Sequence, residues 1–202
     1  MIAIIDYGVG NLFSVEKAII ASGGRAVVTS DAKEIKSADK LVLPGVGAFG
    51  DCMKNLVNTG LVDIIKEEIS NRKPMLGICV GLQLLFEESE ESPGVAGLSV
   101  LKGRVKKIDS KGLKLPHIGW NSLNIADVKS DIDIFKDLGE NSYVYFVHSF
   151  YAEASESIIS ATTEYGEEIT AAVAKENIVA TQFHPEKSGD VGLKILKNFV
   201  EF

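Results

Sequence analysis

Residues 74–83 read Pro-Met-Leu-Gly-Ile-Cys-Val-Gly-Leu-Gln, an apolar run that ends in a cysteine between two glycines. The apolar residues 74–78 predict a buried strand, and the spacing of Leu82, Leu85 and Phe86 predicts a helix over residues 82–91. A strand that passes directly into a helix is typical of parallel sheets with helical crossovers. This stretch therefore indicates an α/β fold with a sharp turn at Cys79.

The same alternation continues on both sides of this stretch. In the N-terminal half we expect strands at residues 2–5, 25–29 and 40–43, and helices at residues 12–21, 53–57 and 61–69. In the C-terminal half we expect a final helix at residues 191–200 and strands at residues 100–108, 118–125, 143–151, 158–163, 170–174 and 178–183. The sequence thus predicts one three-layer α/β domain over residues 1–202, with a mainly parallel central sheet and an antiparallel β extension.

Composition excludes several classes of protein. The 202 residues carry a net charge of −7, which disfavours nucleic acid or an anionic membrane as a partner. Two cysteines do not make a disulfide framework. The first residues lack the pattern of a secretory signal, and no apolar run approaches the ~20 residues that span a bilayer. We expect a soluble, cytoplasmic protein whose thiols stay reduced.

Cys79 stands in the context of a nucleophile elbow, the turn between a strand and a helix that exposes a reactive side chain. Glycines at 77 and 81 suit a strained turn, where larger side chains would collide. The amides at the start of the following helix favour a thiolate, and the Val80 N–H could bind an oxyanion. Cys52 has no such context and is expected to be structural.

A thiol nucleophile needs a base, and the chain has three histidines. His184 follows the expected strand at 178–183 and precedes Pro185 and Glu186. In an extended segment residues i and i+2 point to the same side, so the Glu186 carboxylate could orient the His184 ring. No second histidine or cysteine lies at ligand spacing, so no metal is expected there.

A second glycine loop follows the strand at 40–43. Residues 44–47 read Pro-Gly-Val-Gly, and amides in such a loop can approach a ligand closely. The loop could complete an oxyanion hole through Val46, or it could be an ordinary turn between a strand and a helix.

Taken together, Gly-Ile-Cys-Val-Gly-Leu-Gln at 77–83, Pro-Gly-Val-Gly at 44–47 and His-Pro-Glu at 184–186 resemble the class I glutamine amidotransferase family, over nearly the whole chain. The resemblance implies a flavodoxin-like sheet and a catalytic triad of Cys79, His184 and Glu186. It also implies that glutamine forms a γ-glutamyl thioester on Cys79 and releases ammonia, with neither a metal nor a cofactor.

Residues 6–11, 44–49, 116–121 and 184–188 are similar to one branch of this family, which passes ammonia to a cyclase subunit in histidine biosynthesis. By resemblance, the cyclase partner makes imidazole glycerol phosphate and an aminoimidazole carboxamide ribotide. The residues expected to hold glutamine are Gly47, Gln83, Glu91, His148 and Ser149. Those expected to face the cyclase are Asn11, Trp120, Tyr145 and Lys187. Glu91 could instead be one charge of a solvated run, and Trp120 could lie in the core.

Other functions remain open at this level. Gly8-Val9-Gly10 and Asp31 partly match a dinucleotide-binding fingerprint, although Phe13 replaces the third glycine and is expected to obstruct a cofactor. A stand-alone cysteine hydrolase could use the same triad. A further alternative is the glutaminase subunit of another amidotransferase, such as pyridoxal phosphate synthase or anthranilate synthase.

Overall fold

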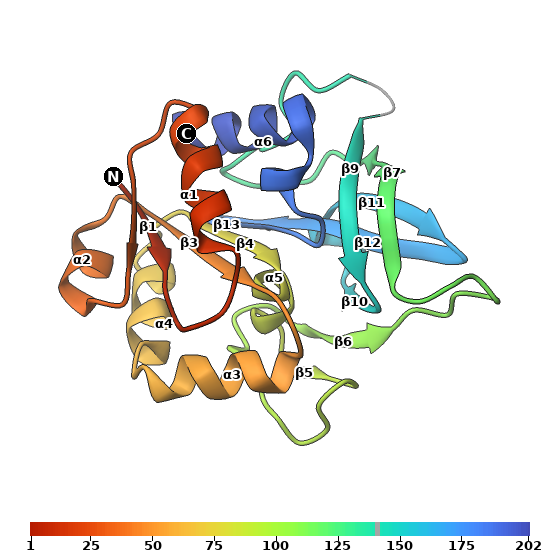
Figure 1. The fold of residues 1–202 in the computed structure, drawn as a ribbon, viewed down its shortest axis with the longest axis horizontal. Coiled ribbons are helices and arrows are strands. Elements are labelled where there is room, and N and C mark those ends of the chain that lie inside the picture. Colours follow the sequence, from red (N-terminus) through yellow and green to blue (C-terminus); the bar gives the residue numbers. More distant parts are fainter. Residues whose placement is uncertain (140–141) are drawn as a thin grey trace.

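The structure is a computed structural model that describes residues 1–139 and 142–202. Its central sheet has eight strands in the order β2, β1, β3, β4, β13, β12, β11, β8 (Figure 1). In that order they are Ala26–Thr29, Ile2–Ile5, Lys40–Gly45, Met75–Cys79, Ile178–Thr181, Glu167–Lys175, Ile159–Tyr165 and Asn124–Ile125. The first five run parallel, and each of the last three runs antiparallel to its neighbour. The predicted sheet with an antiparallel extension is confirmed, and its parallel part has the flavodoxin-like order.

Helices cover both faces of this sheet and make three layers. Helices α1 (Leu12–Ala21) and α6 (Gly189–Glu201) pack together on one face, and α3 (Phe49–Asn58), α4 (Val62–Ser70) and α5 (Val80–Leu84) lie on the other (Figure 1). The inner parallel strands are buried on both faces, as all residues of β1, β4 and β13 show, whereas the edge strand β2 is only half-buried.

The antiparallel extension carries two smaller sheets. One pairs β10 (Phe150–Ala154) with β6 (Gly103–Lys107) and β6 with β5 (Glu88–Ser89). The other is an antiparallel pair of β7 (His117–Ser122) and β9 (Tyr143–His148). The predicted strands at 118–125 and 143–151 are therefore each divided into two strands that belong to different sheets.

The predicted helix over residues 82–91 is wrong beyond its first turn. Helix α5 ends at Leu84, and the chain then turns so that β5 pairs with β6. Leu82, Leu84, Leu85 and Phe86 are all buried, because strands β3 and β4 on one side and helix α3 on another pack against this segment. Continuous burial thus produced a spacing that resembled the apolar stripe of an amphipathic helix.

Helix α2 (Ala32–Ser37) was not predicted. The Asp31 carboxylate caps it by accepting hydrogen bonds from the backbone N–H groups of Lys33 and Glu34. Elsewhere, within residues 1–139 and 142–202, no helix is long and apolar enough to cross a membrane.

Candidate active site

Three neighbouring parallel strands bring the predicted site residues to one edge of the sheet. The register pairs Gly45 at the end of β3 with Cys79 at the end of β4, and Thr181 at the end of β13 with Ile78. The loop after β3 and the segment that contains His184 therefore flank Cys79 from its two sides. Ligands of open α/β sheets bind at this carboxyl edge.

Cys79 lies on a strained turn between β4 and α5. It is buried, and its backbone has φ +56° and ψ −112°, a conformation that residues with a Cβ rarely adopt. The two glycines allow the turn to pack. A Cβ on Gly81 would lie 1.8 Å from the backbone oxygen of Leu43, and one on Gly77 would lie 3.0 Å from the Ala180 Cβ. The sequence argument for this turn therefore has a direct steric basis.

His184 and Glu186 form a buried hydrogen-bonded pair. Nδ1 of His184 lies 2.8 Å from Oε1 of Glu186, and the two side chains are only 4% and 1% exposed. The extended geometry expected from sequence is wrong in detail, because Pro185–Lys187 forms a 3-10 turn, η2, that brings Glu186 back to the ring.

The protonation of His184 follows from these neighbours. Burial alone would lower the pKa of His184, but the neighbouring Cys79 sulfur and the Glu186 carboxylate favour the charged ring and raise the pKa to about 10. The imidazole is therefore charged at neutral pH and lies beside the sulfur.

A cavity of about 280 Å³ opens beside Cys79. It is lined by Val46, Gly47, Cys79, Val80, Gln83, Glu91, Pro116, Val147, His148, Ser149, Phe150 and His184. All residues expected to hold glutamine or to donate to an oxyanion thus surround one space. Sequence reasoning missed Pro116, Val147 and Phe150, which carry no chemical signal of their own.

Gln83 and Glu91 reach this cavity with their polar groups already partly engaged. Nε2 of Gln83 donates to the Phe150 oxygen at 3.1 Å and to Oε1 of Gln182 at 3.0 Å. Oε2 of Glu91 accepts from the Phe49 N–H at the start of α3 at 2.8 Å. Glu91 is half-buried, so its interpretation as one charge of a solvated run is wrong.

His148 belongs to a buried chain of hydrogen bonds that the sequence did not reveal. Its Nδ1 donates to the Phe150 oxygen at 2.9 Å, so its Nε2 accepts from Nδ1 of His117 at 3.0 Å. Burial lowers the pKa of His148 to about 3 and that of His117 to about 4. Both rings are neutral, and the His148 ring supports the cavity wall with both of its nitrogens engaged.

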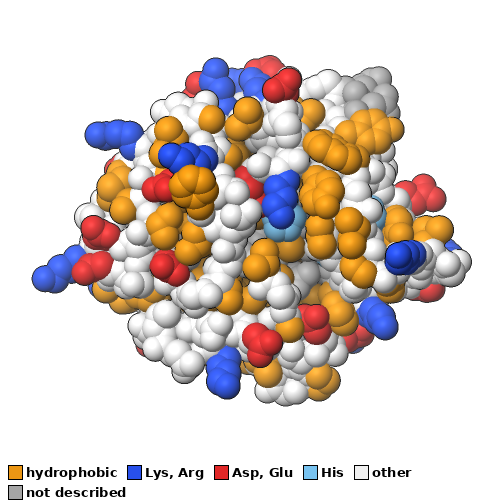
Figure 2. Space-filling model, in the orientation of Figure 1, with side chains coloured by type: hydrophobic (Ala, Val, Ile, Leu, Met, Phe, Trp, Pro, Cys, Tyr) orange, Lys and Arg blue, Asp and Glu red, His pale blue; other side chains and the backbone are white. Residues whose placement is uncertain are grey.

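The residues expected to face a partner lie on the surface near this edge. Trp120 is 55% exposed, so the alternative of a core position is wrong, and its ring meets that of Tyr145 edge-on at 6.0 Å. Asn11 at the start of α1 and Lys187 in η2 are exposed. Figure 2 shows hydrophobic side chains gathered over the β7–β9 part of this face, where Ile118 and Tyr143 are also exposed.

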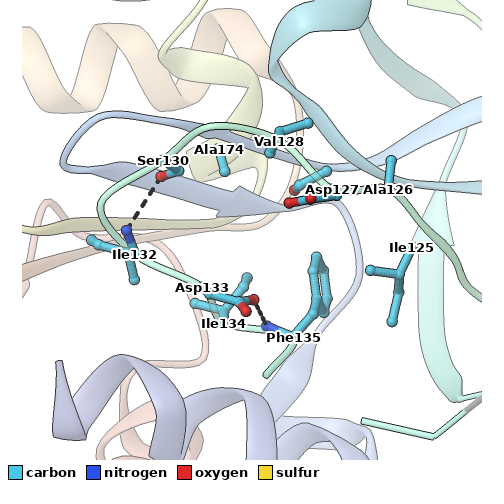
Figure 3. A pocket seen from close by; sticks show the side chains of 11 residues that line it. Ile125, Ala126, Asp127, Val128, Ser130, Ile132, Asp133, Ile134, Phe135 and Ala174 are labelled. Atoms are coloured by element: carbon cyan, nitrogen blue, oxygen red, sulfur yellow. Dashed lines mark hydrogen bonds between the residues drawn. The ribbon is translucent and has the colours of Figure 1, made fainter. Parts of the chain in front are cut away.

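A larger cavity lies elsewhere, between the loop after β8 and the antiparallel end of the sheet (Figure 3). It has a volume of about 460 Å³ and is lined mainly by apolar side chains together with Asp127 and Asp133. No described residue of its lining is a histidine or a cysteine, so the thiol chemistry expected from the sequence has no place there. The described part of the chain also holds no cluster of three side chains suited to a metal ion.

The residues behind the dinucleotide alternative have other roles in the structure. Asp31 caps α2, and a Cβ on Gly10 would lie 3.4 Å from Pro44, so the first glycine loop packs beside the second. Phe13 is 68% exposed, so it does not enter the packing between α1 and β1.

A central strand that ends in a strained cysteine, with a histidine held by a glutamate at the same edge of the sheet, is the arrangement of an α/β enzyme with a thiol nucleophile. A family model, glutamine amidotransferase class-I, matches residues 3–202. The chain belongs to the class I glutamine amidotransferase family, and it is a glutamine-hydrolysing enzyme.

Relatives that match over nearly their full length are subunits of one enzyme, imidazole glycerol phosphate synthase. The chain is 54% identical to the imidazole glycerol phosphate synthase subunit HisH of Caldanaerobacter subterraneus, covering 100% of this chain and 98% of that protein. It is 53% identical to the subunit of the same name from Methanothermobacter thermautotrophicus, with the same coverage.

Solved structures share the fold at low sequence identity. A glutamine amidotransferase crystal structure aligns with a TM-score of 0.76 at 18% identity, over 99% of each chain. PurLQS from Thermotoga maritima aligns with a TM-score of 0.77 at 18% identity, over 99% of this chain and 97% of that one.

Proposed function

We propose that this chain is the glutaminase subunit of an imidazole glycerol phosphate synthase. It hydrolyses glutamine to glutamate and ammonia and passes the ammonia to a cyclase subunit. That subunit makes imidazole glycerol phosphate and aminoimidazole carboxamide ribotide in histidine biosynthesis. The observation that carries the proposal is the identity of about half of all residues, over the full length, to subunits of that name. A cytoplasmic location is part of the proposal, because Cys79 must stay reduced to react.

In the first half of the proposed reaction, the Cys79 thiolate attacks the γ-carboxamide carbon of glutamine. The tetrahedral intermediate places negative charge on the former carbonyl oxygen, which the N–H groups of Val46 and Val80 stabilise. The His184 imidazolium donates its proton to the leaving nitrogen, the C–N bond breaks, and ammonia departs. The product on the enzyme is a γ-glutamyl thioester.

In the second half, neutral His184 removes a proton from water, and the resulting hydroxide attacks the thioester. The C–S bond breaks and expels the Cys79 thiolate, so that the original ion pair is restored and glutamate leaves. Glu186 holds the His184 ring throughout, since its 2.8 Å hydrogen bond keeps the proton on Nδ1 and directs Nε2 to the reacting atoms.

Recognition of the substrate follows from the groups that line the cavity. Glu91 is the one acidic side chain among the described residues of this lining and complements the α-ammonium group of glutamine. Gly47, Gln83 and Ser149 supply polar contacts, while the engaged ring of His148 shapes the wall.

Hydrolysis without a waiting acceptor would waste ammonia, so we expect the chain alone to be a poor glutaminase. The cyclase would dock on the face that contains Asn11, Trp120, Tyr145 and Lys187. The glycines on both sides of Val46 allow its peptide unit to turn and thereby to switch one oxyanion donor, which is worth roughly 10²–10³ in rate.

The test is glutamate release by the purified chain alone, then with the cyclase, and then with the cyclase and its ribotide ligand. We expect activity to rise at each addition. Full activity of the isolated chain, unchanged by either addition, would refute the coupling. Unaltered coupling in an Asn11→Ala, Lys187→Ala double variant would refute only the proposed route.

A further inference from the structure

Two buried side chains hold the Pro44–Gly47 loop from behind. Tyr7, which follows β1, donates its hydroxyl hydrogen to the Pro44 oxygen at 2.6 Å. Cys52, in the first turn of α3, donates its thiol hydrogen to the Val46 oxygen at 3.3 Å. Burial raises the pKa of the Cys52 thiol to about 11 and raises the pKa of the Tyr7 phenol as well. Both groups therefore keep their hydrogens and remain donors.

Each of these bonds fixes a whole peptide unit. In a planar trans peptide the N–H points opposite to the C=O, so a fixed carbonyl also fixes the next N–H. Tyr7 thus sets the Pro44–Gly45 peptide, and Cys52 sets the Val46–Gly47 peptide. The Gly45–Val46 peptide lies between them, held by neither side chain. Because Gly45 has no Cβ, this middle unit can turn at small steric cost.

The strand register gives the orientation of the middle peptide. The Leu41 N–H donates to the Pro74 oxygen at 2.9 Å, so Leu41 faces β4. Backbone groups of a strand alternate in direction with a period of two, and Gly45 therefore faces β4 as well, beside its partner Cys79. The Gly45 carbonyl points toward the end of β4, and the Val46 N–H, on the opposite side of the same peptide, points away.

We propose that Tyr7 and Cys52 are positioning residues that confine the rotation of the oxyanion loop to the single Gly45–Val46 peptide. The inference rests on the proposed function, because it assigns the turned Val46 N–H to the oxyanion hole. With both outer peptides fixed, one rotation moves the Val46 N–H to a defined place near Cys79. Without them the rotation spreads over three peptides, and the donor reaches the oxyanion less accurately.

The position of an oxyanion donor affects the chemical step more than substrate binding. The test is steady-state glutamine hydrolysis by the chain in complex with its cyclase and the ribotide ligand. Tyr7→Phe and Cys52→Ala should each lower kcat by about 2- to 10-fold, which corresponds to one hydrogen bond. The KM for glutamine should stay within about twofold of wild type.

Matched variants separate positioning from packing. Cys52→Ser keeps a donor and should recover most of the kcat lost in Cys52→Ala. Ser22→Ala removes a buried 2.8 Å hydrogen bond from another hydroxyl to a backbone oxygen, that of Ala18 at the end of α1, away from the loop, and should leave kcat unchanged. Melting temperatures of the variants would show that each is folded.

Wild-type kcat in both Tyr7→Phe and Cys52→Ala would overturn the inference. So would a loss confined to KM, or a Cys52→Ser variant as slow as Cys52→Ala. A wild-type complex that releases no glutamate at all would instead count against the proposed function, which keeps the two failures distinct.

Discussion

Replacement of Glu186 by glutamine removes the charge beside His184 and keeps the shape of the side chain. Oε1 of Glu186 accepts from Nδ1 of His184 at 2.8 Å, and Oε2 is buried without a hydrogen-bond partner among the described residues. The new NH₂ group therefore has two poor positions. At the Oε2 position it is a buried donor without an acceptor, and toward Nδ1 it selects the tautomer that carries the proton on Nε2.

The size of the effect follows from the hydrogen bond that is weakened. A hydrogen bond to a charged group contributes about 1.5–3 kcal/mol, and each 1.4 kcal/mol is a factor of ten, so kcat should fall about 10- to 150-fold. His184→Ala removes the base itself and should cost several powers of ten. The pKa of His184 should also fall in Glu186→Gln, because the neighbouring negative charge is gone.

The assay is glutamate release in the activated complex, combined with NMR titration of the His184 ring. Circular dichroism would establish that both variants are folded. A Glu186→Gln enzyme with wild-type kcat, or a His184→Ala enzyme that retains full activity, would refute the assigned roles.

Three further predictions follow from the same site. An electrophilic glutamine analogue should add its mass to Cys79 and not to Cys52, and Cys79→Ala should lower hydrolysis by several powers of ten; peptide mass spectrometry and activity measurements test both. Gly81→Ala should cost on the order of 3 kcal/mol or more of stability in denaturant unfolding, because its Cβ would lie 1.8 Å from a backbone oxygen of β3, whereas Gly139→Ala, with open space around it, should change little. The pKa of His184 is about 10 in the folded chain against 6.5 in the unfolded chain. Protonation of His184 therefore contributes to the free energy of unfolding in full below pH 6.5, and this contribution is lost as the pH rises through 10. The wild type should therefore lose more stability than His184→Ala between pH 7 and pH 10, and an equal loss in both would contradict this assignment.

Local patterns predicted much of the fold because they depend on neighbours in the chain. Strand β1 and helix α1 have the bounds that the sequence predicts, and the turn at Cys79 lies between its two glycines as expected. The sequence alone also indicated an α/β sheet with an antiparallel extension. The helix over residues 82–91 failed because its apolar spacing reflects burial on all sides, which depends on how distant strands pack around it.

The sequence by itself determined which residues have the chemistry of a thiol amidohydrolase, since reactivity resides in residue type and local turn geometry. Only the tertiary structure decided which of them meet. Cys79 and His184 come together because β4 pairs with β13, and His117 reaches His148 because β7 pairs with β9. The contact of Tyr7 with the Pro44 oxygen depends likewise on the packing of β1 beside β3. Such pairings join segments far apart in the chain, and no local pattern of residues encodes the register between them.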